Sequence, residues 1–137
     1  MHAQEMLAAR PDARTRENDP LVAAVEALYD CAQACAACAD ACVAELDAKL
    51  AQCIRLTMDS ADLCQAAGSV ATRRTGSNAT VVMGLLMLAE ALARDCAAEC
   101  ETHAARHAHC RVCAEVCRRT EAACGEARLA VAREQMQ

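Results

Sequence analysis

The sequence has no tryptophan and no phenylalanine, and it has only one tyrosine, two prolines and four glycines. The chain therefore lacks the usual aromatic filler of a large core, and it lacks rings on which nucleic-acid bases could stack. Strand-favouring residues are scarce, and no useful stretch alternates apolar and polar residues, so β-structure is nearly excluded. The net charge of −5, without a basic patch, argues against nucleic-acid binding.

Targeting signals are also missing from the sequence. Residues 1–20 contain no apolar run long enough for the h-region of a signal peptide, and they contain no twin-arginine pair. No stretch comes close to a membrane span, since the most apolar run covers only residues 81–88. We therefore expect a cytoplasmic protein without a membrane partner, in a compartment where thiols stay reduced.

Apolar residues make up 55% of the chain, but alanine and cysteine supply much of that fraction. Alanine has the highest helix propensity, and small side chains let helices approach closely. A length of 137 residues fits one domain. Composition therefore predicts a single all-α domain.

Two helix boundaries are marked clearly. Asp19 can cap a helix whose first position is Pro20. Gly76 follows a cationic stretch that ends a second helical segment. We predict a flexible or loosely docked N-terminal arm over residues 1–19, with a short helical turn at 3–9, and a helical domain over 20–137.

The helical pattern on each side of Gly76 is longer than most globular helices, which leaves two arrangements open. One is a hairpin of two long helices, and the eleven-residue spacing of Cys31, Cys42, Cys53 and Cys64 suits it. The other is an antiparallel up-down four-helix bundle with a Cys-lined core. Its helices would cover residues 20–44, 48–74, 78–103 and 107–134. We favour the bundle because these segments are nearly equal in length, although neither glycine nor proline marks the two added breaks.

The twelve cysteines fall in phase on every predicted helix. At about 100° per residue, the cysteines of each helix lie within about 60° of arc. They are Cys31, Cys35, Cys38, Cys42, Cys53, Cys64, Cys96, Cys100, Cys110, Cys113, Cys117 and Cys124. In a bundle the four faces would meet inside as a column of thiols about 20 Å long.

The bundle end that carries the chain termini is predicted to be an apolar plug. Its predicted members are Leu21, Val25, Leu28, Val70, Val82, Leu85 and Leu129. The cysteines crowd toward the opposite end, where two helix connections lie. The predicted molecule is therefore a sulfur-lined tube that is closed at one end.

Three explanations of the cysteines do not involve metal. Twelve cysteines in phase on four segments exceed what core packing needs. Cysteines one turn apart on a helix are poorly aimed for a disulfide. A redox Cys-x-x-Cys pair needs a helix N-terminus to activate its thiol, whereas Cys35 lies in mid-helix. The pattern therefore favours metal binding.

Thiolate is a soft ligand that suits Cu(I), Zn(II) and iron–sulfur clusters. Zinc and iron–sulfur clusters need discrete sets of four ligands, and a continuous column does not divide into such sets. Cu(I) accepts low coordination and shares bridging thiolates, so twelve thiolates could hold on the order of a dozen or more Cu(I) ions. A zinc or mixed-metal thiolate buffer and a thiol redox buffer stay open as alternatives.

Three histidines lie at the thiol end of the predicted tube. His103 continues the stripe of Cys96 and Cys100, and His107 and His109 follow it closely. Imidazole is a capable copper ligand, so all three are candidate metal ligands at the mouth. The sequence contains no Ser-His-Asp set, carboxylate pair or phosphate-binding loop, and we predict that the protein is not an enzyme.

These residues resemble those of a known family. The motifs are Cys31-x3-Cys35-x2-Cys38-x3-Cys42, Cys96-x3-Cys100, Cys110-x2-Cys113-x3-Cys117 and the histidines His103, His107 and His109. Over about residues 20–135 the chain resembles the bacterial copper storage proteins, and specifically their cytosolic branch.

The resemblance implies a four-helix bundle that binds many Cu(I) ions through inward thiolates. It also implies assembly as a homotetramer, copper entry at the histidine end, and a copper chaperone as a candidate donor. The second predicted helix departs from a full stripe because Thr57 and Ser60 occupy the in-phase positions between Cys53 and Cys64. The cluster arrangement beside that helix is therefore open.

Overall fold

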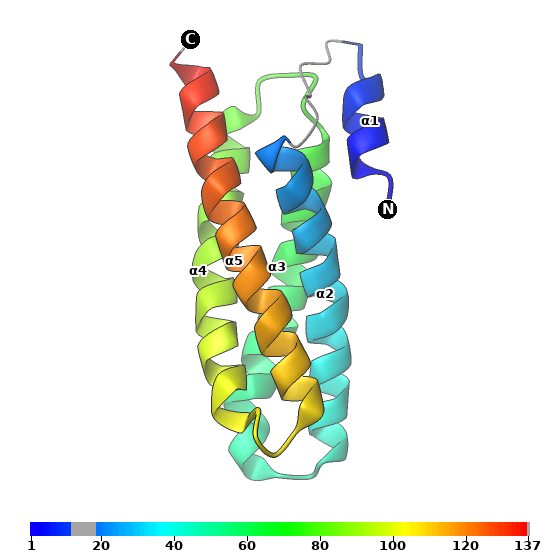
Figure 1. Cartoon of the computed structure of the whole chain (residues 1–137), viewed down its shortest axis with the longest axis vertical. Helices are drawn as coiled ribbons and strands as arrows, with labels where there is room; N and C mark the ends of the chain where they lie inside the picture. The colour runs from blue at the N-terminus through cyan, green and yellow to red at the C-terminus, as the bar shows by residue number, and fades with distance from the viewer. Residues whose placement is uncertain (12–18, 137) are drawn as a thin grey trace.

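The computed structural model describes residues 1–11 and 19–136, which form five α-helices and one 3-10 helix without any strand (Figure 1). The elements are α1 (Ala3–Ala9), α2 (Pro20–Ala44), η1 (Ala48–Leu50), α3 (Ala51–Thr72), α4 (Ala79–His103) and α5 (Ala108–Gln135). The four long helices match the predicted segments closely. The four-helix bundle is therefore confirmed, and the hairpin of two long helices is not formed.

Each long helix packs against two others. α2 contacts α3 and α5, and α4 also contacts α3 and α5, so α2 and α4 face each other across the core. The α2–α3 and α4–α5 connections lie together at the end opposite the C-terminus (Figure 1). We call this end the mouth.

The start of α2 follows the sequence signal. The carboxylate of Asp19 accepts a hydrogen bond from the backbone N–H of Leu21 at 2.8 Å, and Pro20 occupies the first helical position. The α2–α3 connection has no such signal, because Leu46 takes the left-handed backbone conformation there with a φ of 53°. Glycine or asparagine usually marks this conformation. The predicted break between the two helices is confirmed, but leucine is an unusual residue for its left-handed position.

Part of the predicted flexible or loosely docked arm is a docked helix. Ala3 and Leu7 of α1 are buried, and α1 contacts α2 and α3. Burial of the leucine supplies the apolar contact that holds this short helix on the bundle. Residues 12–18 of the arm lie outside the described residues, and the domain division at residue 19 stays a prediction.

The end of the bundle opposite the mouth is apolar, but three of its predicted members are not fully buried, since Val70 and Leu85 are partly buried and Leu129 is exposed. Leu21, Val25, Leu28 and Val82 are buried there as predicted. Leu129 is 51% exposed, whereas Val131 is buried. The prediction for Leu129 was wrong because its position is about 140° from the Cys124 stripe at 100° per residue, whereas Val131 lies on it. On α4, Leu86 is fully buried and Leu85 only partly.

The expectation that no stretch comes close to a membrane span was too strong. The 25 residues of α2 are long enough for a membrane span. A window of 18 residues within α2, with a mean hydropathy of 1.4, is also apolar enough by composition. Half of that window is buried inside the bundle. α2 turns its leucines, most of its valines and all four of its cysteines toward the other helices, as in the core helix of a folded bundle.

Candidate metal centre

All twelve cysteines are free thiols, and each is at most 2% exposed. They come from α2, α3, α4 and α5, as the phase of the stripes predicts. Each helix buries its cysteine stripe, so the four stripes meet in the core. The core next to the mouth is therefore built largely of sulfur.

The centre of the column is a cluster around Cys35. Its Sγ lies 3.7 Å from the Sγ atoms of Cys31, Cys113 and Cys117. Together with Cys96, the thiols of Cys35, Cys113 and Cys117 form a set whose ligand atoms all lie within 4.8 Å of one another. Helices α2, α4 and α5 supply this set, which we call the central cluster.

A second set lies at the mouth and contains an imidazole. Nδ1 of His109 lies 3.5 Å from the Sγ atoms of Cys38 and Cys110, and 3.8 Å from that of Cys42. The Sγ atoms of Cys42 and Cys110 are 4.0 Å apart. We call these four residues the mouth cluster, since they combine three thiols with the nitrogen of one partly exposed ring.

A third set links the two clusters. The thiols of Cys38, Cys100 and Cys113 lie within 4.8 Å of one another. Cys38 belongs to the mouth cluster and Cys113 to the central cluster, so the sulfurs form a continuous path. Cys53 joins this path from α3, since its Sγ lies 3.6 Å from that of Cys100.

Cys64 and Cys124 lie nearer the plug. Neither belongs to a set of three or more close ligand atoms among the described residues. Burial raises the pKa of Cys124 to about 12, with added effects from the charges of Cys31 and Glu90. These two thiols are buried as predicted but are the least surrounded by other ligands.

Burial also raises the pKa values of two thiols at the mouth. It raises the pKa of Cys42 to about 11, and the charge of Cys38 adds to the shift. Burial raises the pKa of Cys110 in the same way. Thiols of this kind keep their protons at neutral pH, so a metal ion that binds them must displace those protons.

The helix α3 presents hydroxyl groups where the others present thiols. Thr57 and Ser60 are fully buried between Cys53 and Cys64. The hydroxyl of Thr57 donates to the backbone carbonyl of Cys53 at 2.7 Å, whereas the hydroxyl of Ser60 has no hydrogen-bond partner. The central cluster therefore lacks a thiol from α3.

Two of the three predicted histidines share one carboxylate. Nε2 of His109 lies 3.2 Å from one oxygen of Glu45, and Nδ1 of His107 lies 3.5 Å from the other. The two rings are stacked, with centroids 5.3 Å apart. Burial alone lowers the pKa of His109, but hydrogen bonds to Cys38 and Glu45 outweigh it and raise the pKa.

Glu45 was missed by the sequence analysis. The only available signal was its position in the predicted break at residues 45–47, at the same end of the bundle as the histidines. His103 is placed differently from the other two, because its Nε2 lies 2.7 Å from a carboxylate oxygen of Glu99. None of the close ligand sets in the described part of the chain includes His103.

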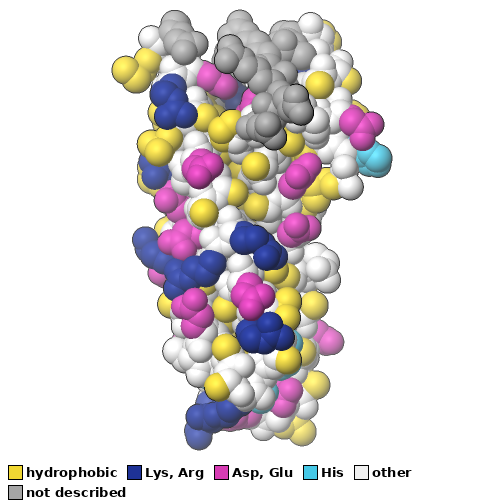
Figure 2. Space-filling model, in the orientation of Figure 1, with side chains coloured by type: hydrophobic (Ala, Val, Ile, Leu, Met, Phe, Trp, Pro, Cys, Tyr) yellow, Lys and Arg dark blue, Asp and Glu magenta, His cyan; other side chains and the backbone are white. Residues whose placement is uncertain are grey.

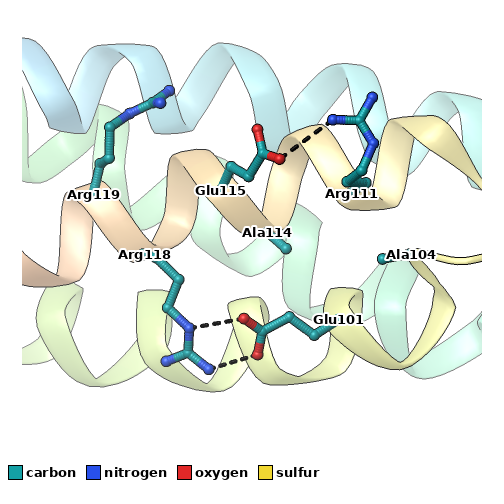
Figure 3. A pocket seen from close by; sticks show the side chains of 7 residues that line it. All are labelled: Glu101, Ala104, Arg111, Ala114, Glu115, Arg118 and Arg119. Carbon is teal, nitrogen blue, oxygen red and sulfur yellow. Dashed lines mark hydrogen bonds and ion pairs between the residues drawn. The ribbon is translucent and has the colours of Figure 1, made fainter.

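The outer surface differs in chemistry from the core. Charged side chains of both signs are spread over the face in Figure 2. A hollow between α4 and α5 is lined by Glu101, Ala104, Arg111, Ala114, Glu115, Arg118 and Arg119 (Figure 3). Arg118 donates to Glu101 at 2.7 Å and so ties the two helices together. This lining offers no thiol or imidazole, and it is not a candidate site for a soft metal ion.

The copper storage protein family matches residues 17–129 of the chain. A solved structure of the copper storage protein from Streptomyces lividans, loaded with 10 copper equivalents, is 41% identical with a TM-score of 0.87. That match covers 93% of this chain and 98% of the other. A mutant of the Streptomyces lividans protein with one histidine changed to alanine matches at 42% identity and a TM-score of 0.81, covering 84% and 97% of the two chains.

A third structure, of copper loading to a cytosolic copper storage protein from Streptomyces lividans with five coppers, is 45% identical with a TM-score of 0.78. It covers 80% of this chain and 92% of the other. No curated protein matches the sequence.

Proposed function

The chain belongs to the copper storage protein family, and from this premise we propose that it stores multiple Cu(I) ions in the cytoplasm on the thiolates of its core. The observation that carries the proposal is the continuous column of twelve buried thiols from four helices. Thiolates are ligands that Cu(I) prefers, and neighbouring Cu(I) ions can share them. The proposed role is storage and sequestration rather than catalysis.

The proposed ligands are the twelve cysteines, with His109 at the mouth. A Cu(I) ion would reach its first thiols in the mouth cluster, where the ring of His109 is partly exposed. It would then pass to the central cluster through Cys38, Cys100 and Cys113, whose thiols connect the two. Where the ligand is a protonated thiol, its proton leaves to solvent and a copper–sulfur bond replaces the sulfur–hydrogen bond.

His103 and His107 complete the proposal as outer contacts of the mouth. Both side chains are partly exposed, so they would meet an incoming ion before the buried thiols do. Assembly as a homotetramer and delivery by a copper chaperone also belong to the proposal. Their support is the likeness to the copper storage family.

The test is an anaerobic titration of the reduced apoprotein with Cu(I) against a competing chelator. We expect binding of on the order of a dozen equivalents per chain, because bridging thiolates hold roughly one Cu(I) each. A stoichiometry of one or two would overturn the proposal. A variant with serine in place of Cys35, Cys113 and Cys117 should lose several equivalents, since it dismantles the central cluster.

Zinc is the competing cargo, because thiolates bind it as well. Elemental analysis of protein isolated from metal-replete cells distinguishes the two. Copper in excess of zinc supports copper storage. Zinc in a fixed ratio with little copper would support the zinc buffer instead.

A further inference from the structure

We propose that Glu45 is a positioning residue of the copper entry site, because its carboxylate holds the ring of His109 with Nδ1 facing the thiols of the mouth. The inference rests on the proposed storage function and goes beyond it. It assigns a task in copper delivery to a carboxylate that belongs to none of the thiol sets and lies close to His107 and His109.

The ring of His109 lies between two different environments. On one side, Nδ1 faces the sulfurs of Cys38 and Cys110 at 3.5 Å. On the other side, Nε2 lies 3.2 Å from a carboxylate oxygen of Glu45. A carboxylate can only accept, so Nε2 keeps its hydrogen. When the ring is neutral, as a metal ligand must be, the lone pair of Nδ1 is left to face the thiols. A metal-binding histidine is typically oriented in this way by a carboxylate on its second nitrogen.

Glu45 is well placed to hold this orientation. It follows the last residue of α2, while His107 and His109 lie at the start of α5. Its two oxygens face the two rings separately, at 3.5 and 3.2 Å. The carboxylate therefore spans the mouth and ties the α2–α3 connection to the α4–α5 connection.

A second glutamate–histidine pair at the same end provides a matched comparison. Glu99 and His103 are one turn apart on α4, and their contact is shorter, at 2.7 Å. Yet His103 belongs to no close ligand set among the described residues, whereas His109 shares one with three thiols. The shorter contact would make Glu99 the stronger partner of its histidine. Of these two glutamates, however, only Glu45 contacts a ring whose other nitrogen faces thiols.

The proposal predicts a change in delivery without a change in capacity. When Glu45 is replaced by alanine, the ring of His109 can turn, and its lone pair faces the thiols for only part of the time. The twelve thiols are untouched, so the total copper bound stays the same. Loss of such an orienting partner typically weakens metal binding by about 10- to 100-fold.

The experiment compares Glu45→Ala, Glu45→Gln and Glu99→Ala with the unmodified chain. The rate of Cu(I) transfer from a copper–chelator complex to the apoprotein is followed by stopped-flow absorbance, and total capacity by titration. We expect Glu45→Ala to slow the transfer about tenfold. Glu45→Gln should recover much of the rate, because an amide oxygen still accepts from Nε2–H. Glu99→Ala should load like the unmodified chain.

A second readout follows the ring directly. Long-range proton–nitrogen NMR spectra of the apoprotein report which ring nitrogen carries the hydrogen. At a pH where the ring is neutral, we expect His109 to carry it on Nε2 in the unmodified chain and in Glu99→Ala. We expect a mixture in Glu45→Ala.

Normal transfer by Glu45→Ala would overturn the inference. So would equal slowing by Glu99→Ala, which would indicate a general effect of charge at the mouth. Equal slowing by Glu45→Gln and Glu45→Ala would also contradict it, because the hydrogen bond would then be irrelevant. Low capacity of the unmodified chain would overturn the storage function instead, so the two failures are distinguishable.

Discussion

The Sγ atoms of Cys53 on α3 and Cys100 on α4 lie 3.6 Å apart, slightly closer than the 3.7 Å contacts that Cys35 makes in the central cluster. Through this contact α3 joins a sulfur path that the other three helices mostly build. Cys100 also belongs to the set that links the mouth cluster to the central cluster. The contact therefore connects α3, which supplies no residue to the close ligand sets among the described residues, to the route along which copper would move.

Replacement of Cys53 by serine should lower copper capacity by roughly one equivalent, since a bridging thiolate holds about one Cu(I) ion. The fold should persist, because serine is close to cysteine in size. Anaerobic titration followed by native mass spectrometry measures the change. Met58→Leu is the control, since Met58 is 55% exposed on the same helix, and its capacity should be unchanged. Full capacity in Cys53→Ser would exclude Cys53 as a ligand.

Replacement of Ser60 by cysteine should raise copper capacity by roughly one equivalent. Ser60 is fully buried on the α3 stripe between Cys53 and Cys64, at a level where α3 supplies no thiol. The same titration measures the gain. If the capacity does not rise, position 60 is out of reach of the copper ions.

Ser60→Ala is the companion variant and tests the apoprotein. The hydroxyl of Ser60 is buried without a hydrogen-bond partner, and such a group costs about 1–3 kcal/mol. Its removal should leave the thermal stability of the apoprotein equal or higher, with no gain in copper capacity. A marked fall in melting temperature would show that the hydroxyl is satisfied in solution.

Two glycines in helices should respond differently to alanine. A Cβ at Gly84 would meet nothing within 4 Å, so Gly84→Ala should stabilise the fold by about 0.5–1 kcal/mol. A Cβ at Gly68 would lie 3.2 Å from the ring of Tyr29, which would have to shift. Gly68→Ala should therefore gain less, or lose stability. Thermal unfolding of the apoproteins gives the order, and equal gains would contradict this packing.

Copper binding should release protons and strengthen as the pH rises. Burial raises the pKa of Cys42 to about 11 and that of Cys124 to about 12, so both thiols are protonated at neutral pH. Each displaced proton changes the apparent copper affinity about tenfold per pH unit. Titration in weak buffer with an indicator measures the protons released. Release of none would mean that the thiols are already ionised.

The same shifts predict how the apoprotein responds to alkali. The folded-state pKa values of Cys42 and Cys124 lie above the ordinary thiol value. Their contribution to stability is therefore complete below the ordinary thiol pKa and is lost as the pH rises toward about 11 and 12. Urea unfolding of the reduced apoprotein at increasing pH should show a falling midpoint. A rising midpoint would contradict the sign of these shifts.

Several features were predictable because they depend on local geometry. A residue turns an α-helix by about 100°, so the spacing of Cys31, Cys35, Cys38 and Cys42 by itself defines a stripe. The cap at Asp19 with Pro20 defines the start of α2 in the same local way. Burial of all twelve thiols followed once the segments were helices in a bundle.

Other features depended on contacts that no local pattern contains. The turn at Leu46 carries none of the usual residues for a left-handed conformation, so the α2–α3 break had no marker. Leu129 was placed in the plug for its apolar character, although its helical phase turns it toward solvent. Hydrophobicity alone was a poor guide there, since phase decides which face is buried.

The sequence by itself determined four helical segments, one thiol face on each, and an end rich in histidine, because helix phase and capping are properties of neighbouring residues. Only the tertiary structure decided which thiols lie together. Only it showed that α3 contributes no thiol to the central cluster, and that Glu45 lies against His109 at 3.2 Å. Glu45 and His109 are 64 positions apart in the sequence, and helix packing alone sets the distance between them.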